Sequence, residues 1–287
     1  MAGRVEHEVI KNWQHFVAIV DNYDMGPPHQ PIFLFRGQAD SDWPLVPSLV
    51  RMANRSALGN EHVSQLEAQL LQEFMKQAHL HLSPEILPAK GDLLSWWTLM
   101  QHHHAPTRLL DWTYSPFIAL YFACEQLDRQ EGAVWMVASR FISDQMVERF
   151  PDCAGYATRA RQQQYYHSSS GPDFLEFIER NTQTARMVAQ QTMHSVSTAP
   201  LADHGELVCS VLSGNESSKG NPFRKLIIPA ARKIEFLRCL RFMNVTSNAL
   251  FPGVDGLGRS VAELALLSCN HFKLQITAEK IYGEKSS

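Results

Sequence analysis

The sequence predicts an α+β fold in which helices surround a mixed β core. Short apolar segments bounded by turn residues, such as PIFLFRGQ and AVWMVA, are typical of strands. Longer segments repeat apolar residues at helical spacing. Because no internal repeat and no clean linker interrupts the 287 residues, we expect a single domain. Its predicted parts are a helical lead-in over residues 1–30, a main body over 31–270 and a C-terminal tail over 271–287.

The N-terminal part combines helices with one strand. Apolar residues on one stripe predict a helix from about Val5 to Val20. The strand PIFLFRGQ follows and stops at Gly37. Two amphipathic segments, over residues 61–82 and 91–104, predict helices, and Asp92 is the expected N-cap of the second.

The next helix has well-marked boundaries. Ser115 at the N-cap and Pro116 at the first helical position predict its start, and it should reach about Gln130. Its residues are apolar nearly all round, so we expect it to be buried. Gly132 breaks the helix, and AVWMVA then predicts a buried strand.

The C-terminal half is less regular. A short helix is predicted at FLEFIERN, a strand at ARMVAQQTMHSVS and another strand at FRKLIIP. A helix over residues 231–244 and a final helix after LFPGVDG complete the chain. The polar segment 158–173 predicts a loop.

Composition narrows the class of protein. A net charge of -3 argues against binding nucleic acid or membranes through bulk charge alone. Five scattered cysteines without a CxxC pair favour a reducing compartment. Charges occupy the N-terminus where a signal peptide needs an apolar run, and no stretch of about 18 apolar residues occurs. We therefore expect a cytoplasmic protein without a membrane span.

Polar residues gather in QHHHAPTRLLDWTYSP, directly before the apolar helix. Adjacent helical positions point about 100° apart, so the three histidines cannot all reach one ion, and we expect no metal site. His102 and His103 are instead candidates for lining a pocket, or they are exposed at a helix end. Arg108 and Asp111 lie among leucines, where charges are usually paired or used. Either they form a salt bridge or one of them faces a cleft.

Other polar residues lie at the ends of predicted elements. Arg36 ends an apolar strand and is suited to bidentate contact with phosphate or carboxylate, or to a structural ion pair. Gly37 beside it permits close approach of backbone or ligand. Ser115 lies at a helix N-terminus, which can receive an anion. Gln190 and Gln191 are adjacent on a predicted strand, so only one can face a given cleft.

Taken together, FRGQ (35–38), WPLVPSLVR (43–51) and PTRLLDWT (106–113) resemble the FRG domain family. Later segments, including RMVAQQ and LFPGVDGL, are similar to the family in the same order, so the resemblance spans about residues 32–264 and implies an FRG domain over 31–270. Two positions depart from the family pattern. His103 and His104 replace Tyr-Gly, and Thr192 stands where a glycine often follows the glutamine pair.

The order of these motifs is also similar to that of ADP-ribosyltransferases, which implies a related mixed β core and NAD as substrate. A glutamine stands where those enzymes carry a glutamate, so Asp111 or a nearby glutamate (Glu176, Glu179 or Glu206) is a candidate substitute. The residues implied for catalysis are Arg36, Asp111, Ser115, Gln190 and Gln191. Those implied for binding NAD are Arg36, Gly37, Gln38, His102, His103, Thr107, Arg108, Trp112, Thr113 and Tyr121.

The resemblance therefore predicts an NAD-dependent ADP-ribosyltransferase, acting as a toxin or anti-phage effector on RNA or protein and accompanied by an antitoxin or chaperone. Arg159 and Arg161, in a Gln-Tyr-rich segment, are candidates for contact with a single strand. Two alternatives stay open. One is a non-catalytic module that binds a nucleotide or a partner protein in the same pocket. The other is a metal-dependent nuclease or other hydrolase built on Asp111 and the histidines.

Overall fold

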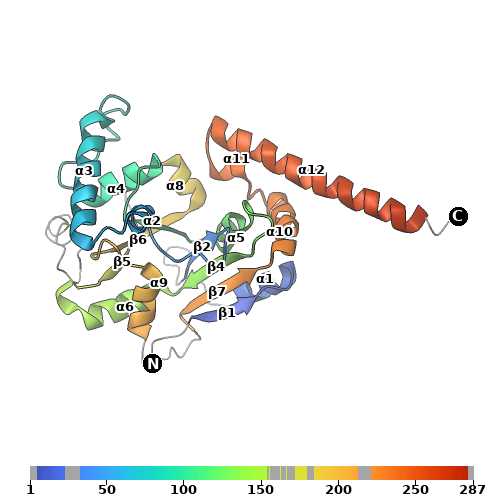
Figure 1. The fold of residues 1–287 in the computed structure, drawn as a ribbon, viewed down its shortest axis with the longest axis horizontal. Coiled ribbons are helices and arrows are strands. Elements are labelled where there is room, and N and C mark those ends of the chain that lie inside the picture. Colours follow the sequence, from blue (N-terminus) through green and yellow to red (C-terminus); the bar gives the residue numbers. More distant parts are fainter. Residues whose placement is uncertain are drawn as a thin grey trace.

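The computed structural model describes residues 5–22, 33–153, 155, 162, 166, 172–179, 184–212 and 221–283. Strands in this part of the chain form one mixed sheet (Figure 1). They are β1 (Glu6–Val9), β2 (Leu34–Gln38), β3 (Leu110–Thr113), β4 (Gly132–Val137), β5 (Leu175–Ile178), β6 (Thr192–Ser197) and β7 (Phe223–Ile228). Their order across the sheet is β1-β7-β4-β2-β3-β6-β5; β1 and β7 run parallel, and the other neighbours run antiparallel.

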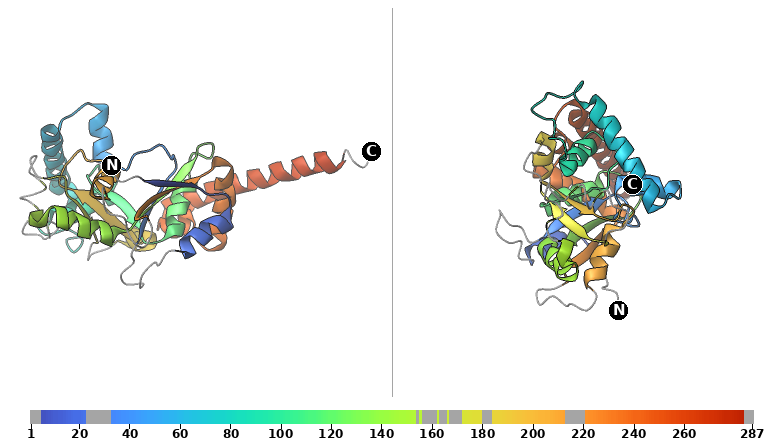
Figure 2. Two further views of the ribbon diagram at one scale, coloured as in Figure 1. Left: turned by 90° about the horizontal axis from the view of Figure 1, so that it is seen from below. Right: turned by 90° about the vertical axis from the view of Figure 1, so that its left-hand side faces the viewer.

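Helices cover both faces of this sheet, as Figures 1 and 2 show. Strand β4 is buried along its whole length because alternate side chains enter different cores. Trp135 packs in one core with α3, α4, α6 and α9, and Met136 packs in the other with α1, α5, α10 and α11. The helices are α1 (Trp13–Asp21), α2 (Ser48–Arg55), α3 (Asn60–Ala78), α4 (Leu93–His102), α5 (Pro116–Cys124), α6 (Ser139–Arg149), α8 (Ala185–Gln190), α9 (His204–Leu212), α10 (Ala230–Phe242), α11 (Ser247–Leu250) and α12 (Val254–Gly283), with a 3-10 turn at Pro151–Cys153.

The α+β prediction is confirmed, and so is the start of α5. The Ser115 side chain accepts a hydrogen bond from the Ile118 N–H, and Pro116 is the first helical residue. Asp92 likewise caps α4 by accepting from the Ser95 N–H. Helix α5 lies directly on β2, since a Cβ added to Gly37 would stand 1.9 Å from the Ala119 carbonyl oxygen. Gly37 thus serves close packing of helix on strand.

The predicted helix from Val5 to Val20 is wrong in its first half. Strand β1 occupies residues 6–9 and extends the sheet by pairing with β7. The Arg224 guanidinium bonds both Glu6 and Glu8, which holds this edge strand in place. Helix α1 begins only at Trp13, after the Asn12 side chain accepts from the His15 N–H. The lead-in is therefore strand followed by helix.

Two predictions in the C-terminal half are wrong, because a predicted helix is a strand and the first part of a predicted strand is a helix. FLEFIERN contains β5 instead of a helix, because Leu175–Ile178 pairs with β6. ARMVAQ forms α8 instead of a strand, because the Thr184 side chain caps it by accepting from the Met187 N–H. Gln191 ends this helix in the left-handed region at φ 49°, and β6 starts at Thr192. The family often has a glycine at position 192 for a tight turn, and here Gln191 makes this turn instead.

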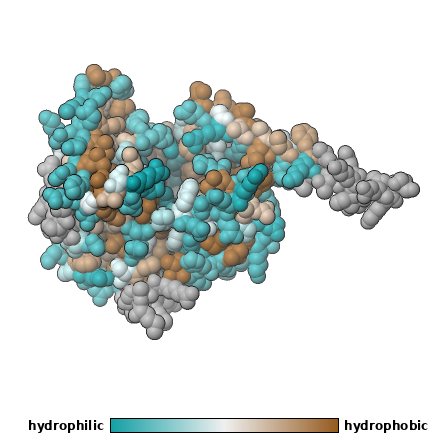
Figure 3. All heavy atoms as spheres, in the orientation of Figure 1, coloured by the Kyte–Doolittle hydropathy of each residue, from teal (hydrophilic) through white to brown (hydrophobic). Residues whose placement is uncertain are grey.

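Helix α12 projects from the body, with the C-terminus near its far end (Figures 1 and 2). It continues through residues 271–283, where we expected a tail. Hydrophobic residues gather over its first turns in Figure 3, where Val254, Leu257, Val261 and Leu264 are exposed. None of the helices that the structure describes has the length and apolar content to cross a membrane. Most of the predicted loop at 158–173 lies outside the described residues.

Candidate functional site

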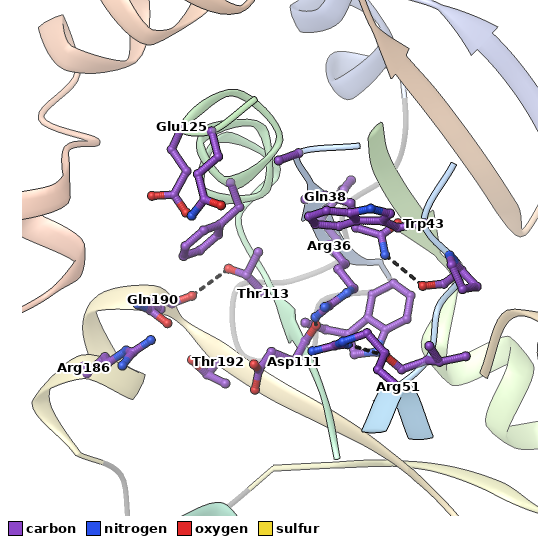
Figure 4. Close-up of a pocket in the computed structure, with 18 of the residues that line it drawn as sticks. Arg36, Gln38, Trp43, Arg51, Asp111, Thr113, Glu125, Arg186, Gln190 and Thr192 are labelled. Atoms are coloured by element: carbon purple, nitrogen blue, oxygen red, sulfur yellow. Dashed lines mark hydrogen bonds between the residues drawn. The ribbon is translucent and has the colours of Figure 1, made fainter. Parts of the chain in front are cut away.

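A cleft opens where the two central strands part. Strand β2 pairs with β4 along five positions but with β3 at one, Phe35 opposite Thr113. A cavity of about 730 Å³ is lined by both strands, together with residues of α2, α8, β6 and the end of α5. Figure 4 shows its side chains converging from these separate elements.

Arginines supply the positive charge of this cleft. Arg36, Arg51, Arg55 and Arg186 all line it. The Arg36 Nη1 atom donates to the Asp111 main-chain oxygen at 2.5 Å, whereas its Nε is buried with no hydrogen-bond partner among the described residues. Burial lowers the pKa of Arg36 to about 10, against the opposing charge of Asp111. A guanidinium left with an unused donor favours an anionic ligand.

Asp111 is held by side chains from two other elements. Its Oδ1 atom accepts from Gln101 Nε2 at 2.6 Å and lies 3.3 Å from His194 Nε2, while the side chain is 55% exposed. Thr107 fixes Gln101 by donating to its Oε1 at 2.5 Å. Desolvation raises the pKa of Asp111, but His194 and the charges of Arg36 and Arg186 outweigh it, so the pKa lies below its usual value. The carboxylate is thus kept ionised.

Glu125 is a second carboxyl group of the cleft, and its pKa is shifted in the opposite direction from that of Asp111. It follows α5 directly and lines the cavity. Burial raises the pKa of Glu125 to about 7, and the nearby Glu263 adds to this effect. Arg259, Arg186 and a hydrogen bond with Tyr121 oppose it without restoring the usual value. One cavity therefore contains an ionised carboxylate and a carboxyl group that titrates near neutral pH.

An aromatic side chain borders the cavity away from Glu125 (Figure 4). Trp43 is 45% exposed and lies in the loop after β2. Gln38 holds this loop, because its Nε2 donates to the Pro44 carbonyl oxygen at 3.0 Å. Its Oε1 accepts from the Trp135 indole at 2.6 Å, which ties the loop to β4. The indole of Trp43 offers a face on which a planar ring could stack.

The structure brings seven of the predicted site residues to this cavity. Thr113 donates from Oγ1 to the Gln190 main-chain oxygen at 2.8 Å, and Gln190 Nε2 donates to the Leu250 carbonyl oxygen at 3.0 Å. Gln190 thus reaches the cleft from a helix. The seven that line the cavity are Arg36, Gly37, Gln38, Asp111, Trp112, Thr113 and Gln190.

The other predicted residues do not line the cavity. Arg108 is buried in an ion pair with Glu67, so its position is structural. Tyr121 is buried, and its hydroxyl contacts Ser247 and Glu263 instead of the cavity. Ser115 caps α5, and Gln191 caps α8.

The remaining predicted residues lie around α4. Thr107 acts through Gln101, as described above. His102 borders a neighbouring pocket of about 40 Å³ that also touches Asp111, and its Nδ1 lies 3.3 Å from Thr184 Oγ1. His103 is the C-cap of α4 and faces Phe74 in a separate groove. The adjacent histidines therefore point to different places, as their helical spacing predicts.

The candidate substitutes for the missing glutamate also lie elsewhere. Glu179 accepts from the Tyr114 hydroxyl at 3.1 Å, Glu176 from the Tyr166 hydroxyl at 3.4 Å, and Glu206 is exposed on α9. None of the three lines the cleft. Arg159 and Arg161 lie outside the described residues. Within the described residues, no group of three or more His, Cys, Asp or Glu side chains is arranged to hold a metal ion.

Sequence reasoning missed Gln101, Glu125 and His194. Gln101 is the first residue of the QHHH motif and directly precedes three histidines, which are the more usual signal of a functional site. Glu125 ends the apolar helix, where a charged residue ordinarily indicates the boundary. His194 meets Asp111 only because β3 and β6 pair in the register that puts the two opposite each other. No local pattern reveals that register.

Comparison with known proteins supports the resemblance noted in the sequence. The model of the FRG domain matches residues 31–132. Residues 31–132 thus belong to an FRG domain. Every cleft residue from Phe35 to Gln126 lies within the matched FRG segment, and Arg186, Gln190 and Thr192 join it from beyond. No curated protein and no solved structure matches the chain, so the likeness to the ADP-ribosyltransferase fold stays a prediction.

Proposed function

We propose that the cleft binds NAD and that the protein transfers ADP-ribose to RNA or protein. The observation that carries this proposal is the pairing of Arg36, with its unused buried donor, and the ionised Asp111 in one cavity. A dinucleotide needs cations for its pyrophosphate and a negative charge near the sugar that reacts. The cleft offers both, and its volume of about 730 Å³ is typical of small-molecule sites.

In this proposal Arg36 and Arg51 bind the pyrophosphate, and Trp43 stacks on one of the rings. Cleavage breaks the bond between the nicotinamide nitrogen and the ribose, and nicotinamide leaves with the electron pair. The ribose then carries oxocarbenium character, which a nearby carboxylate stabilises. Asp111 is suited to this task because Gln101 and His194 fix its position and its environment keeps it ionised.

The role in the cell rests on the family resemblance. Action as a toxin or anti-phage effector, an antitoxin or chaperone partner, and a cytoplasmic location all stay predictions.

The test is NAD turnover by the purified protein. NAD labelled in its adenylate half is incubated with total cell RNA and, separately, with total cell protein, and nicotinamide release is followed. We expect label in one pool and its loss in Arg36→Ala, with the variant folded as judged by circular dichroism. Binding of NAD without nicotinamide release favours a non-catalytic module. Degradation of the RNA that EDTA abolishes favours a nuclease.

A further inference from the structure

The two carboxyl groups of the cleft share Arg186 as a neighbour but differ in the other groups that set their charge. Asp111 receives a hydrogen bond from Gln101 and lies beside His194 and two arginines. Glu125 directly follows α5, receives no hydrogen bond from Gln101 or His194, and has Glu263 as a like-charged neighbour. Where the surroundings in one site move the pKa values of two titratable groups apart, one group is suited to stay charged and the other to exchange a proton.

The groups that face Glu125 come from three helices. Tyr121 belongs to its own helix α5, Arg186 to α8, and both Arg259 and Glu263 to α12. Within the part of the chain that the structure describes, these are the titratable and charged groups that shift the pKa of Glu125. They form a mixed surrounding of two cations, one carboxylate and one phenol.

The two arginines beside Glu125 both stack on the ring of Phe251. The guanidinium of Arg186 lies 4.9 Å from the centre of the Phe251 ring, and that of Arg259 lies 4.4 Å from it. Glu263 is buried and pairs with Arg241 while contacting Ser247. Stacking on Phe251 keeps both cations near Glu125 and fixes their positions.

Glu125 also occupies a different end of the cavity from the aromatic group. In Figure 4 it lies on the same side as Arg186 and Gln190, whereas Trp43 and Arg51 lie on the other side, with Arg36 and Asp111 between them. A dinucleotide bound along Trp43, Arg51 and Arg36 would leave the Glu125 end free for a second substrate.

We propose that Glu125 is the general base that removes a proton from the acceptor, and that the acceptor is a neutral hydroxyl or N–H group. This inference rests on the proposed transfer of ADP-ribose. The acceptor oxygen or nitrogen forms a bond to the ribose carbon as the bond to nicotinamide breaks. Nicotinamide leaves with the electron pair, and the acceptor proton passes to the Glu125 carboxylate. An acceptor already ionised, such as a carboxylate or thiolate, needs no base.

The test compares Glu125→Gln with wild type and with Glu131→Gln, an exposed glutamate in the loop that follows the helix. Transfer of label from adenylate-labelled NAD to total cell RNA and total cell protein is measured from pH 5 to pH 9, and NAD binding is measured by calorimetry. Loss of a general base typically costs about 100-fold or more. We expect such a loss of transfer in Glu125→Gln with NAD binding within about twofold, and wild-type behaviour in Glu131→Gln.

The pH profile separates a base from a merely structural residue. Because the base acts when deprotonated, wild-type transfer should rise with pH through about 7, the pKa of Glu125, and the residual rate of Glu125→Gln should lack this rise. Glu125→Asp should restore part of the rate together with the rise. Transfer by Glu125→Gln at the wild-type rate and with the same profile overturns the inference alone. Wild type that neither binds NAD nor releases nicotinamide overturns the proposed function as well.

Discussion

Arg108 and Arg36 both lie beside β3, and their hydrogen bonds differ. Arg108 is buried, and its guanidinium donates to Glu67, to the main-chain oxygens of Ser197 and Thr198, and to that of Tyr166. The rings of Trp97 and Tyr166 pack against it at 5.0 and 5.9 Å. Arg36 makes one hydrogen bond, to Asp111, and its buried Nε has no partner among the described residues.

This difference distinguishes an arginine that stabilises the fold from one that is available to bind a ligand. A guanidinium whose donors are all used has nothing left to offer a ligand, and it stabilises the junction of α3 with the sheet. A guanidinium that faces a cavity with an unused donor can still donate a hydrogen bond to an anionic ligand. Two arginines beside the same strand thus take opposite roles, and variants can test each assignment.

The largest expected effect is on folding, through Arg108. Arg108→Met leaves Glu67 buried and unpaired, which should lower the free energy of unfolding by about 3–5 kcal/mol. Urea denaturation measures this loss. Adding Glu67→Leu should recover most of it, because replacing both partners by apolar groups removes the unpaired charge. A single variant as stable as wild type would show that the ion pair has no structural role.

A second effect on stability is expected from Glu125, whose raised pKa sets it apart from the ionised Asp111. The pKa of Glu125 is raised from 4.5 to about 7, so the folded state binds the extra proton and wild-type stability falls as pH rises from 4.5 to 7. Glu125→Gln removes this dependence and should be more stable than wild type at pH 8, by roughly 1–3 kcal/mol. At pH 4 the two should be equal. Thermal unfolding of both proteins at pH 4 and pH 8 measures this difference in stability. The same difference at both pH values would refute the raised pKa of Glu125.

A smaller effect is expected from the positioning of Asp111. Gln101→Leu removes the hydrogen bond to Oδ1 and frees the carboxylate, which we expect to reduce turnover about tenfold, with little change in the affinity for NAD. The loss should appear in kcat and leave KM within about twofold. His62→Leu, at an exposed position of α3, is the matched control. Unchanged turnover in Gln101→Leu would mean that His194 alone suffices to orient Asp111.

Much of the framework could be predicted because its signals are local. Ser115 and Pro116 mark the start of α5 by their own chemistry, and the apolar run of β4 can be recognised without knowing its neighbours. The FRG motifs directed attention to Arg36 and Asp111, which do meet in the cleft.

What could not be predicted depends on contacts between distant segments. The segment containing β1 has a helix-like stripe and becomes a strand because β7 offers an edge to pair with. Arg108 and Asp111, three residues apart, are indistinguishable as charges among leucines, and only packing sends one to Glu67 and the other to the cleft. The partnership of Asp111 with His194 requires the register of β3 with β6.

The most direct measurement of the central claim is NAD binding to wild type and to Arg36→Ala by isothermal titration calorimetry. Arg129→Ala, which removes an exposed arginine, is the control. A hydrogen bond to a charged group contributes about 1.5–3 kcal/mol, so Arg36→Ala should bind NAD at least about tenfold more weakly at unchanged melting temperature. Arg129→Ala should match wild type. Equal affinity of Arg36→Ala and wild type, or no binding by wild type, would contradict the account.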